Sequence, residues 1–201
     1  MVRAMEPLSD LSTSTLRRRA LLLSLLGADL TAGYLATRYM ILHSGRAFPG
    51  SGIFSLGARF DTDKLLVAPF QRALYLPSPF LEIGGALGLT ILVIMSGSLA
   101  AALQKKFYLA VSSILTIASL FGVSQIVMFV KNDSICIPSM AHYFFTYVAC
   151  ALAIFSYKRA LHPDIAADNR PLLAMGALHL AQFTLWQLVW AVPFWRGILA
   201  P

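Results

Sequence analysis

Five long runs of apolar residues, separated by short polar segments, dominate this chain. Each is long enough to cross a bilayer, because about 20 residues of α-helix span roughly 30 Å of hydrocarbon. An open backbone finds no hydrogen-bond partner in lipid, so the runs are predicted to be helices. We therefore predict an all-α integral membrane protein, a four-helix bundle with a fifth transmembrane helix. The runs cover residues 20–42, 78–103, 107–130, 135–157 and 171–195.

The polar segments divide the chain further. Residues 1–16 are expected to form a disordered or interfacial arm, as chain ends often do. Residues 43–77 make the longest polar segment, and a long ordered loop is usually functional. The predicted organisation is an arm, a four-helix core over residues 17–159 that contains this loop, and a linker with the fifth helix over residues 160–201.

Composition and charge agree with a membrane protein. Of the 201 residues 58% are hydrophobic and 12% are charged, whereas soluble domains carry roughly a quarter charged residues. The formal net charge is +7, but the basic residues stand in short clusters beside the apolar runs, which indicates topology and headgroup contact rather than nucleic-acid binding. The clusters at 17–19, 105–106 and 158–159 fall on one side if all five runs cross. The positive-inside rule then predicts a cytoplasmic (inner) membrane protein with its N-terminus in the cytoplasm and its C-terminus outside.

The fourth run opens with an unusual set of reactive side chains. Cys136, Ser139, Tyr143, Thr146 and Cys150 follow one another at spacings of three and four, so on a helix they share one stripe. Polar groups on a lipid-immersed helix are expected to face protein. The two cysteines would lie about 21 Å apart on one helix, too far to pair, and they provide neither a disulfide framework nor a zinc site.

Several stretches together resemble one family. They are residues 62–70 (TDKLLVAPF), 75–77 (YLP), 133–139 (DSICIPS) and 155–159 (FSYKR). Over residues 17–159 they are similar to the vitamin K epoxide reductase and disulfide-bond-forming membrane oxidoreductases. The resemblance implies a four-helix core with a long extracytoplasmic loop after the first helix, followed in bacterial members by a fifth helix. It also implies a ligand with a quinone head and an isoprenoid tail.

The chain departs from this family at its redox centre. The family's cysteine positions correspond to Phe54, Thr62 and Ser139, which leaves Cys136 alone. Ser78, or Phe80 in an alignment shifted by two, stands where the family has an asparagine. Disulfide exchange needs a thiolate that attacks a disulfide, so a lone thiol cannot relay electrons within the chain. We expect no cofactor, with a quinone as a ligand or substrate.

Two carboxylates lie inside predicted helices and are functional candidates for that reason. Asp29 lies about 14 Å into the first helix, and Glu82 lies about one turn into the second. Desolvation favours the protonated form of such a group, which could then donate a proton. The alternative is a carboxyl group hydrogen-bonded between helices.

Asp61 and Asp63 lie where the family keeps a loop nucleophile. Two acids this close could divide into a proton donor and its charged partner. Asp-Thr-Asp is also ordinary turn chemistry, in which the side chains bind nearby backbone. No histidines cluster with them, so no metal site is predicted.

His142 follows Ser139 by one turn and could relay protons near neutral pH, or serve as a structural hydrogen bonder. A nucleophile–base pair of Ser139 and His142 would suit hydrolysis, but no Gly-x-Ser-x-Gly motif supports it. In the fifth run His179, Gln182, Trp186 and Trp190 share a face, and the polar pair is expected to pack against the fourth helix.

These residues together favour acid–base chemistry on an isoprenoid or prenylated-quinone-like lipid, most concretely a cyclisation begun by protonation. Aromatic faces would stabilise the carbocation. Expected partners are this substrate and membrane lipids, and a protein partner is compatible with the chain. Two alternatives remain open: a degenerate quinone-binding oxidoreductase that uses Cys136 with a partner's thiol, and a non-catalytic membrane assembly subunit. The predicted catalytic residues are Asp61, Asp63, Glu82 and His142, and the predicted substrate-binding residues are Asp29, Ser78, Gln125, Cys136, Ser139 and Tyr143.

Overall fold

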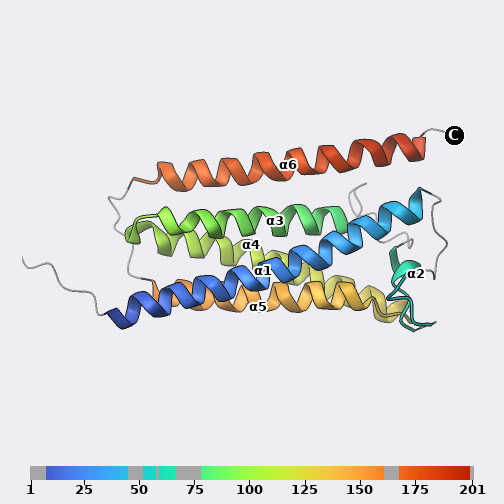
Figure 1. Ribbon diagram of the computed structural model, residues 1–201, viewed down its shortest axis with the longest axis horizontal. Coiled ribbons are helices and arrows are strands. Elements are labelled where there is room, and N and C mark those ends of the chain that lie inside the picture. The colour runs from blue at the N-terminus through green and yellow to red at the C-terminus, as the bar shows by residue number, and fades with distance from the viewer. Residues whose placement is uncertain (1–7, 45–51, 58, 67–77, 161–167, 200–201) are drawn as a thin grey trace, which may run out of the picture.

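A computed structural model describes residues 8–44, 52–57, 59–66, 78–160 and 168–199. The side chains of residues 8–14, 101–102 and 189–199 are outside the description. The described chain is helical, with one isolated bridge between Ser55 and Asp61. The long helices are α1 (Leu8–His43), α3 (Ser78–Met95), α4 (Ala101–Lys131), α5 (Ile137–Arg159) and α6 (Arg170–Leu199), and the short ones are α2 (Thr62–Leu66) and the 3-10 turn η3 (Ser96–Ser98) (Figure 1).

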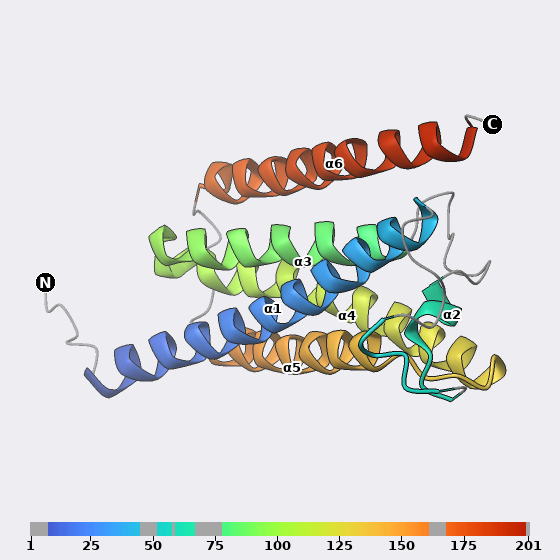
Figure 2. The ribbon, with the colours of Figure 1, turned by 45° about the vertical axis from the view of Figure 1, so that its right-hand side comes forward.

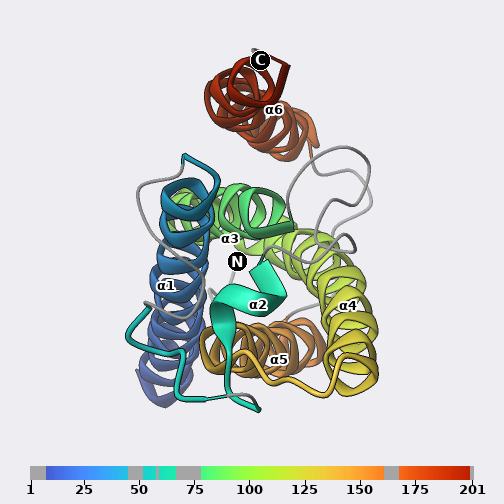
Figure 3. The same cartoon turned by 90° about the vertical axis from the view of Figure 1, so that its right-hand side faces the viewer.

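Four of the helices form a bundle. α1 runs obliquely across it beside α5 and α3, and α4 packs on α5 (Figure 2). α6 lies outside the bundle, mainly against α3 (Figure 3). The segments Thr15–His43, Ser78–Ser98, Leu103–Lys131 and Ile137–Arg159 are long and apolar enough to cross a membrane. The expected all-α architecture is confirmed, with four helices that could cross a membrane, while a membrane crossing by α6 stays a prediction.

Two helix boundaries differ from expectation. The second long helix does not reach residue 103, because it ends at Met95 and the 3-10 turn Ser96–Ser98 follows. The hydroxyls of Ser96 and Ser98 donate to the carbonyls of Val93 and Met95, a local bond that serine favours. Serine and glycine are also poor helix formers. The first helix begins at Leu8, twelve residues before its expected start at residue 20. Once a helix is nucleated, each added residue costs little.

The interior consists of two apolar clusters. The first lies where α1, α3, α4 and α5 meet toward the end at which α4 begins, and includes Leu25, Val93 and Phe107. The second lies toward the loop end and includes Leu35, Phe129 and Tyr143. Leu65 and Leu66 of α2 are buried in this second cluster. α2 therefore closes the loop end of the bundle, where Figure 3 shows it between the ends of the long helices.

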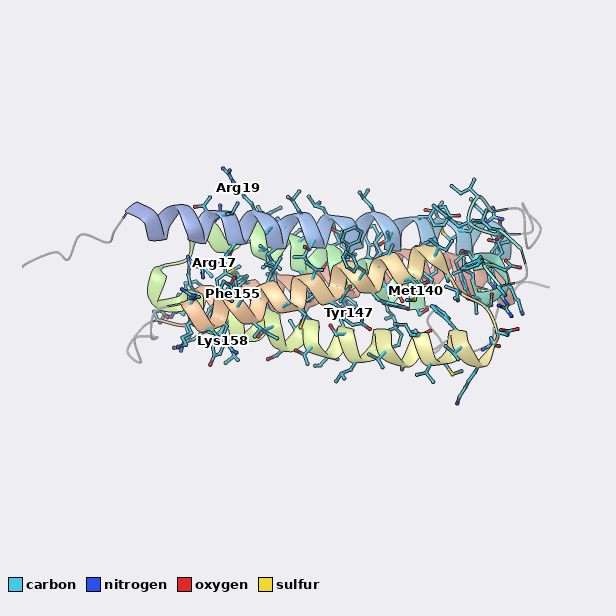
Figure 4. All side chains as sticks on the ribbon, turned by 90° about the horizontal axis from the view of Figure 1, so that it is seen from below. Arg17, Arg19, Met140, Tyr147, Phe155 and Lys158 are labelled. Atoms are coloured by element: carbon cyan, nitrogen blue, oxygen red, sulfur yellow. The ribbon has the colours of Figure 1, made fainter. Side chains whose placement is uncertain are left out.

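The predicted stripe on the fourth long helix faces protein. Cys136 immediately precedes α5, and Ser139, Tyr143, Thr146 and Cys150 lie along it; all five are buried. The basic clusters also gather as expected, since Arg17, Arg19 and Lys158 lie toward the same end of the bundle (Figure 4). The reactive stripe begins at the opposite end, beside α2.

Candidate functional site

An ion pair fastens the long loop to the bundle. Arg38 of α1 donates from Nε to Asp63 Oδ1 at 2.8 Å and from Nη2 to Asp63 Oδ2 at 2.7 Å. The backbone N–H of Gly52 also donates to Asp63 Oδ2, at 3.0 Å. The Asp63 side chain is fully buried, and paired hydrogen bonds to a guanidinium are among the strongest in proteins. These contacts favour a structural role for Asp63 over its predicted role as a proton donor.

Asp61 binds a different set of groups. Its Oδ1 accepts a hydrogen bond from the Lys64 N–H at 3.0 Å, as a helix N-cap does, and another from Ser55 Oγ at 3.1 Å. The carboxyl group thus caps α2 and ties it to the preceding turn. Asp61 and Asp63 bind different partners. The contacts therefore favour turn residues whose side chains bind nearby groups over a proton donor with its charged partner.

Cys136 is the centre of a hydrogen-bonded chain. Ser139 Oγ donates to Cys136 Sγ at 2.9 Å, and the thiol lies 3.7 Å from Thr62 Oγ1. Thr62 Oγ1 donates in turn to the Phe54 carbonyl at 3.3 Å. The residues at the four cysteine positions of the family pattern are therefore neighbours in space, although the loop and α5 are distant in sequence. Burial raises the pKa of the Cys136 thiol, and the hydrogen bonds with Ser139 and Thr62 oppose that shift only in part.

A second polar group joins α3 to α5 in the interior. Tyr143 Oη donates to Glu82 Oε1 at 3.1 Å. The other carboxyl oxygen, Glu82 Oε2, is buried and has no hydrogen-bond partner in the described part of the chain. Tyr143 also stacks on Phe129 of α4, with ring centroids 6.4 Å apart. Ser78 is buried one turn before Glu82, on the same face of α3.

His142 lies beside this carboxyl group. Its Nδ1 is 3.0 Å from the carbonyl of Ala28 in α1, and because a carbonyl can only accept, Nδ1 carries the hydrogen. In a neutral ring Nε2 is then the free proton acceptor. His142 is within electrostatic range of both Glu82 and Asp29. The predicted histidine and the two predicted intramembrane carboxylates therefore belong to one neighbourhood.

Asp29 is paired on one side only. Thr90 Oγ1 of α3 donates to Asp29 Oδ2 at 2.8 Å, while Oδ1 is buried without a partner in the described part. Thr90 was missed by the sequence argument, and a hydroxyl inside an apolar run is a weak signal. Arg38 was missed as well. It lies inside an apolar run, where a charged residue requires a partner, and that position was a signal for a functional or structural role.

Gln125 faces the same interior from α4. Gly122, Gln125 and Phe129 share a stripe at spacings of three and four. A Cβ at Gly122 would lie 3.0 Å from Tyr143 Cδ1 and 3.1 Å from Tyr147 Oη. Gln125 is buried, and its Oε1 has no partner among the described residues. This side of α4 thus presents a free amide acceptor beside the aromatic residues of α5.

The suspected hydrolytic pair is not assembled. Ser139 donates to Cys136, and His142 Nδ1 is directed at Ala28. Each side chain therefore has another partner, and the contacts do not support a serine nucleophile with a histidine base.

The polar face of α6 packs on α3, so the expectation that it packs against the fourth long helix is wrong. Gln187 Nε2 donates to the Phe80 carbonyl at 2.9 Å. Glycines on α3 permit the approach, since Gln187 and Trp186 lie against Gly84. His179 and Gln182 lie in the same way against Gly88. The side chain of Trp190 is outside the described residues.

No protein-family model, curated protein or solved structure matches this chain. The family resemblance therefore stays a prediction, and the interior groups have to be interpreted from their own chemistry.

Separate loss of either partner of the Arg38–Asp63 pair is expected to destabilise the protein. Asp63→Asn or Arg38→Gln should each cost about 3 kcal/mol or more, because one buried charge is left unpaired. The double variant should cost less than the sum of the two. Chemical unfolding in detergent micelles measures all three, with Asp133→Asn as an exposed carboxyl control. Additive losses would show that the pair does not hold the loop.

Cys136 is expected to resist alkylation while the protein is folded. In a Cys150→Ala background, maleimide labelling should be slow in mild detergent and fast in denaturant, because the native thiol is buried. Thiolate forms as pH rises, and a raised pKa moves its formation to higher pH. The labelling rate of the folded protein should therefore fall furthest below that of the denatured protein near pH 8–9. In that range a free thiol of pKa about 8.5 is largely ionised. Equal rates in both conditions would contradict the burial of this thiol.

Proposed function

We propose that the protein is a membrane enzyme that acts on an isoprenoid or prenylated-quinone-like lipid by acid–base chemistry, with Glu82 as the proton donor. One observation carries the proposal: Glu82 Oε2 is buried without a hydrogen-bond partner in the described chain, while Oε1 accepts from Tyr143. Leaving a buried polar atom unpaired costs about 1–3 kcal/mol or more, and such atoms often mark functional sites. A substrate atom would be the natural partner of this oxygen.

The chemistry follows from the neighbours of Glu82. A neutral Glu82 gives its proton to an alkene carbon or an epoxide oxygen of the substrate, and Tyr143 Oη stabilises the carboxylate that remains. The aromatic rings of Tyr143 and Phe129 lie nearby and suit a developing carbocation. Ring closure follows, and His142 Nε2 or Glu82 itself takes the final proton. The protons balance, so the reaction is an isomerisation that needs no oxidant or reductant.

The surroundings suit a lipid substrate. The carboxyl group lies within helices that qualify as membrane spans and beside the apolar cluster of Leu35, Phe129 and Tyr143. Gln125 Oε1 offers an acceptor to a hydroxyl of a quinol or phenol head. Thr62 and Ser139 both contact Cys136, and the Phe54 carbonyl binds Thr62. This grouping supports a scaffold like that of the quinone-dependent family. Within that scaffold, we propose acid–base chemistry in place of thiol exchange.

The thiol alternative has less support. Cys136 is 1% exposed and engaged with Ser139. A mixed disulfide with a partner protein requires a thiolate that the partner can reach. Burial keeps Cys136 out of a partner's reach and raises the pKa of its thiol, which disfavours the thiolate. The contacts therefore favour the carboxyl site.

Deuterium uptake tests the proposal. Nanodiscs with the full chain and a farnesyl-substituted hydroquinone are incubated in D2O, and the lipid is analysed by chromatography and mass spectrometry, together with lipids that copurify with the protein. A cyclised isomer should carry deuterium on carbon. Glu82→Gln should lower its formation about 100-fold or more, as expected for loss of a general acid, and Tyr143→Phe should lower it less.

The matched control is Asp133→Asn, an exposed carboxyl in the turn between α4 and α5. It should leave turnover unchanged. Equal deuterium uptake in wild type and Glu82→Gln would contradict the assignment of the proton donor. Absence of uptake by wild type with both the probe and the copurifying lipids would contradict the reaction class.

We propose further that the basic end lies in the cytoplasm of a bacterial-type inner membrane, and that α6 carries the C-terminus to the outside. A C-terminal alkaline phosphatase fusion should then be active, while a C-terminal green fluorescent protein fusion should be dark. The reverse result would place the C-terminus in the cytoplasm.

A further inference from the structure

The end of the bundle opposite α2 gathers cations from several helices. Arg17 and Lys158 lie close together there on α1 and α5 (Figure 4). The start of α4 joins them, because Lys105 Nζ lies over the ring of Tyr157 in α5. The cations of this basic end are Arg17, Arg18, Arg19, Lys105, Lys106, Lys158, Arg159 and Arg170.

Aromatic rings hold several of these charges at the rim of the bundle. The guanidinium carbons of Arg17 and Arg159 lie 5.8 and 5.3 Å from the centroid of Phe155. Lys105 Nζ lies 5.4 Å from the centroid of Tyr157. Phe155 is itself half exposed. Both guanidinium groups therefore lie beside the same ring.

Arg18 has an unmet hydrogen-bond donor. Its side chain reaches from α1 to the turn after α3, where Nη1 lies against Gly97. Its Nε is buried and has no partner in the described part of the chain. A guanidinium carries five N–H donors and cannot lose its charge, so a buried free donor calls for an acceptor.

The described side chains at this end include few carboxylates. Among the described side chains there, the one carboxylate is Asp168, and it lies 3.9 Å from Arg170. Lys106 Nζ donates to the neutral amide of Asn169 at 2.8 Å. No described carboxylate at this end pairs with Arg18, Lys105 or Arg159, so these three side chains carry positive charge there.

We infer that this basic end binds the phosphate of an anionic phospholipid, with Arg18, Lys105 and Arg159 as its principal ligands. Phosphate oxygens suit guanidinium groups, which can bind them through two parallel hydrogen bonds. The apolar side chains next to the cations are exposed and give the acyl chains a surface, as at Ile154 and Leu23. Basic sites between helices at the cytoplasmic side are known to bind such headgroups.

Lipid preference tests the inference in the full-length protein. Native mass spectrometry compares wild type in mixtures of phosphatidylglycerol and phosphatidylcholine, and in mixtures of cardiolipin and phosphatidylcholine. Anionic lipid should be retained preferentially. Each removed cation should weaken that retention roughly fivefold, since a basic residue near an anionic surface contributes about 1 kcal/mol. The retention of anionic lipid is measured for the single variant Arg18→Gln and for the triple variant Arg18→Gln/Lys105→Gln/Arg159→Gln.

A charge-matched control removes three cations from the opposite end: Arg59→Gln/Lys64→Gln/Lys131→Gln. Loss of preference in the basic-end triple variant with retention in the control supports the inference. Equal loss in both variants would overturn it, because it would reflect net charge alone. Absence of any preference in wild type would overturn it without reference to a variant. Displacement of the lipid by millimolar inorganic phosphate would also overturn it in favour of a soluble phosphate ligand.

Discussion

The cost of an unpaired polar group in hydrocarbon is the constraint on which the arrangement of this bundle depends. Water cannot satisfy such groups there, so they need partners within the protein, and the charged and titratable ones find them on other segments. Arg38 and Asp63 join α1 to the loop, Thr90 and Asp29 join α3 to α1, and Tyr143 and Glu82 join α5 to α3. The interhelical contacts are thus specified by polar pairs, while apolar packing fills the space between them. The Arg38–Asp63 pair also explains why the loop stays close to the bundle end.

The same constraint distinguishes polar groups that are fully paired from those that are not. Asp61 and Asp63 use their carboxyl oxygens to cap α2 and to bind Arg38. Glu82 and Asp29 each keep one buried oxygen without a described partner. A fold that satisfies its loop acids so completely has no structural need for free oxygens in its interior. This contrast is the physical basis for assigning acid–base chemistry to the interior rather than to the loop.

Polarity is distributed unequally along the bundle. Near α2 the interior holds carboxyl, thiol, hydroxyl and imidazole groups, whereas the other end is positive and carries its cations over aromatic rings. The two ends therefore differ in chemistry: one encloses polar and titratable side chains, and the other gathers cations. The proposed action on a lipid would use both, because cations beside headgroups would set the depth of the interior groups in a bilayer.

The sequence by itself determined the helical class, four of the helices long and apolar enough to cross a membrane, and the buried stripe from Cys136 to Cys150, because hydropathy and helical period are local properties. It also named Glu82, His142 and Tyr143 as candidates, because polar groups in apolar runs stand out. Only the tertiary structure decided which candidates meet. In it Arg38 pairs with Asp63, Asp61 caps α2, and the polar face of α6 packs on α3. Partner choice depends on how helices pack in three dimensions, and no spacing along one chain encodes that directly.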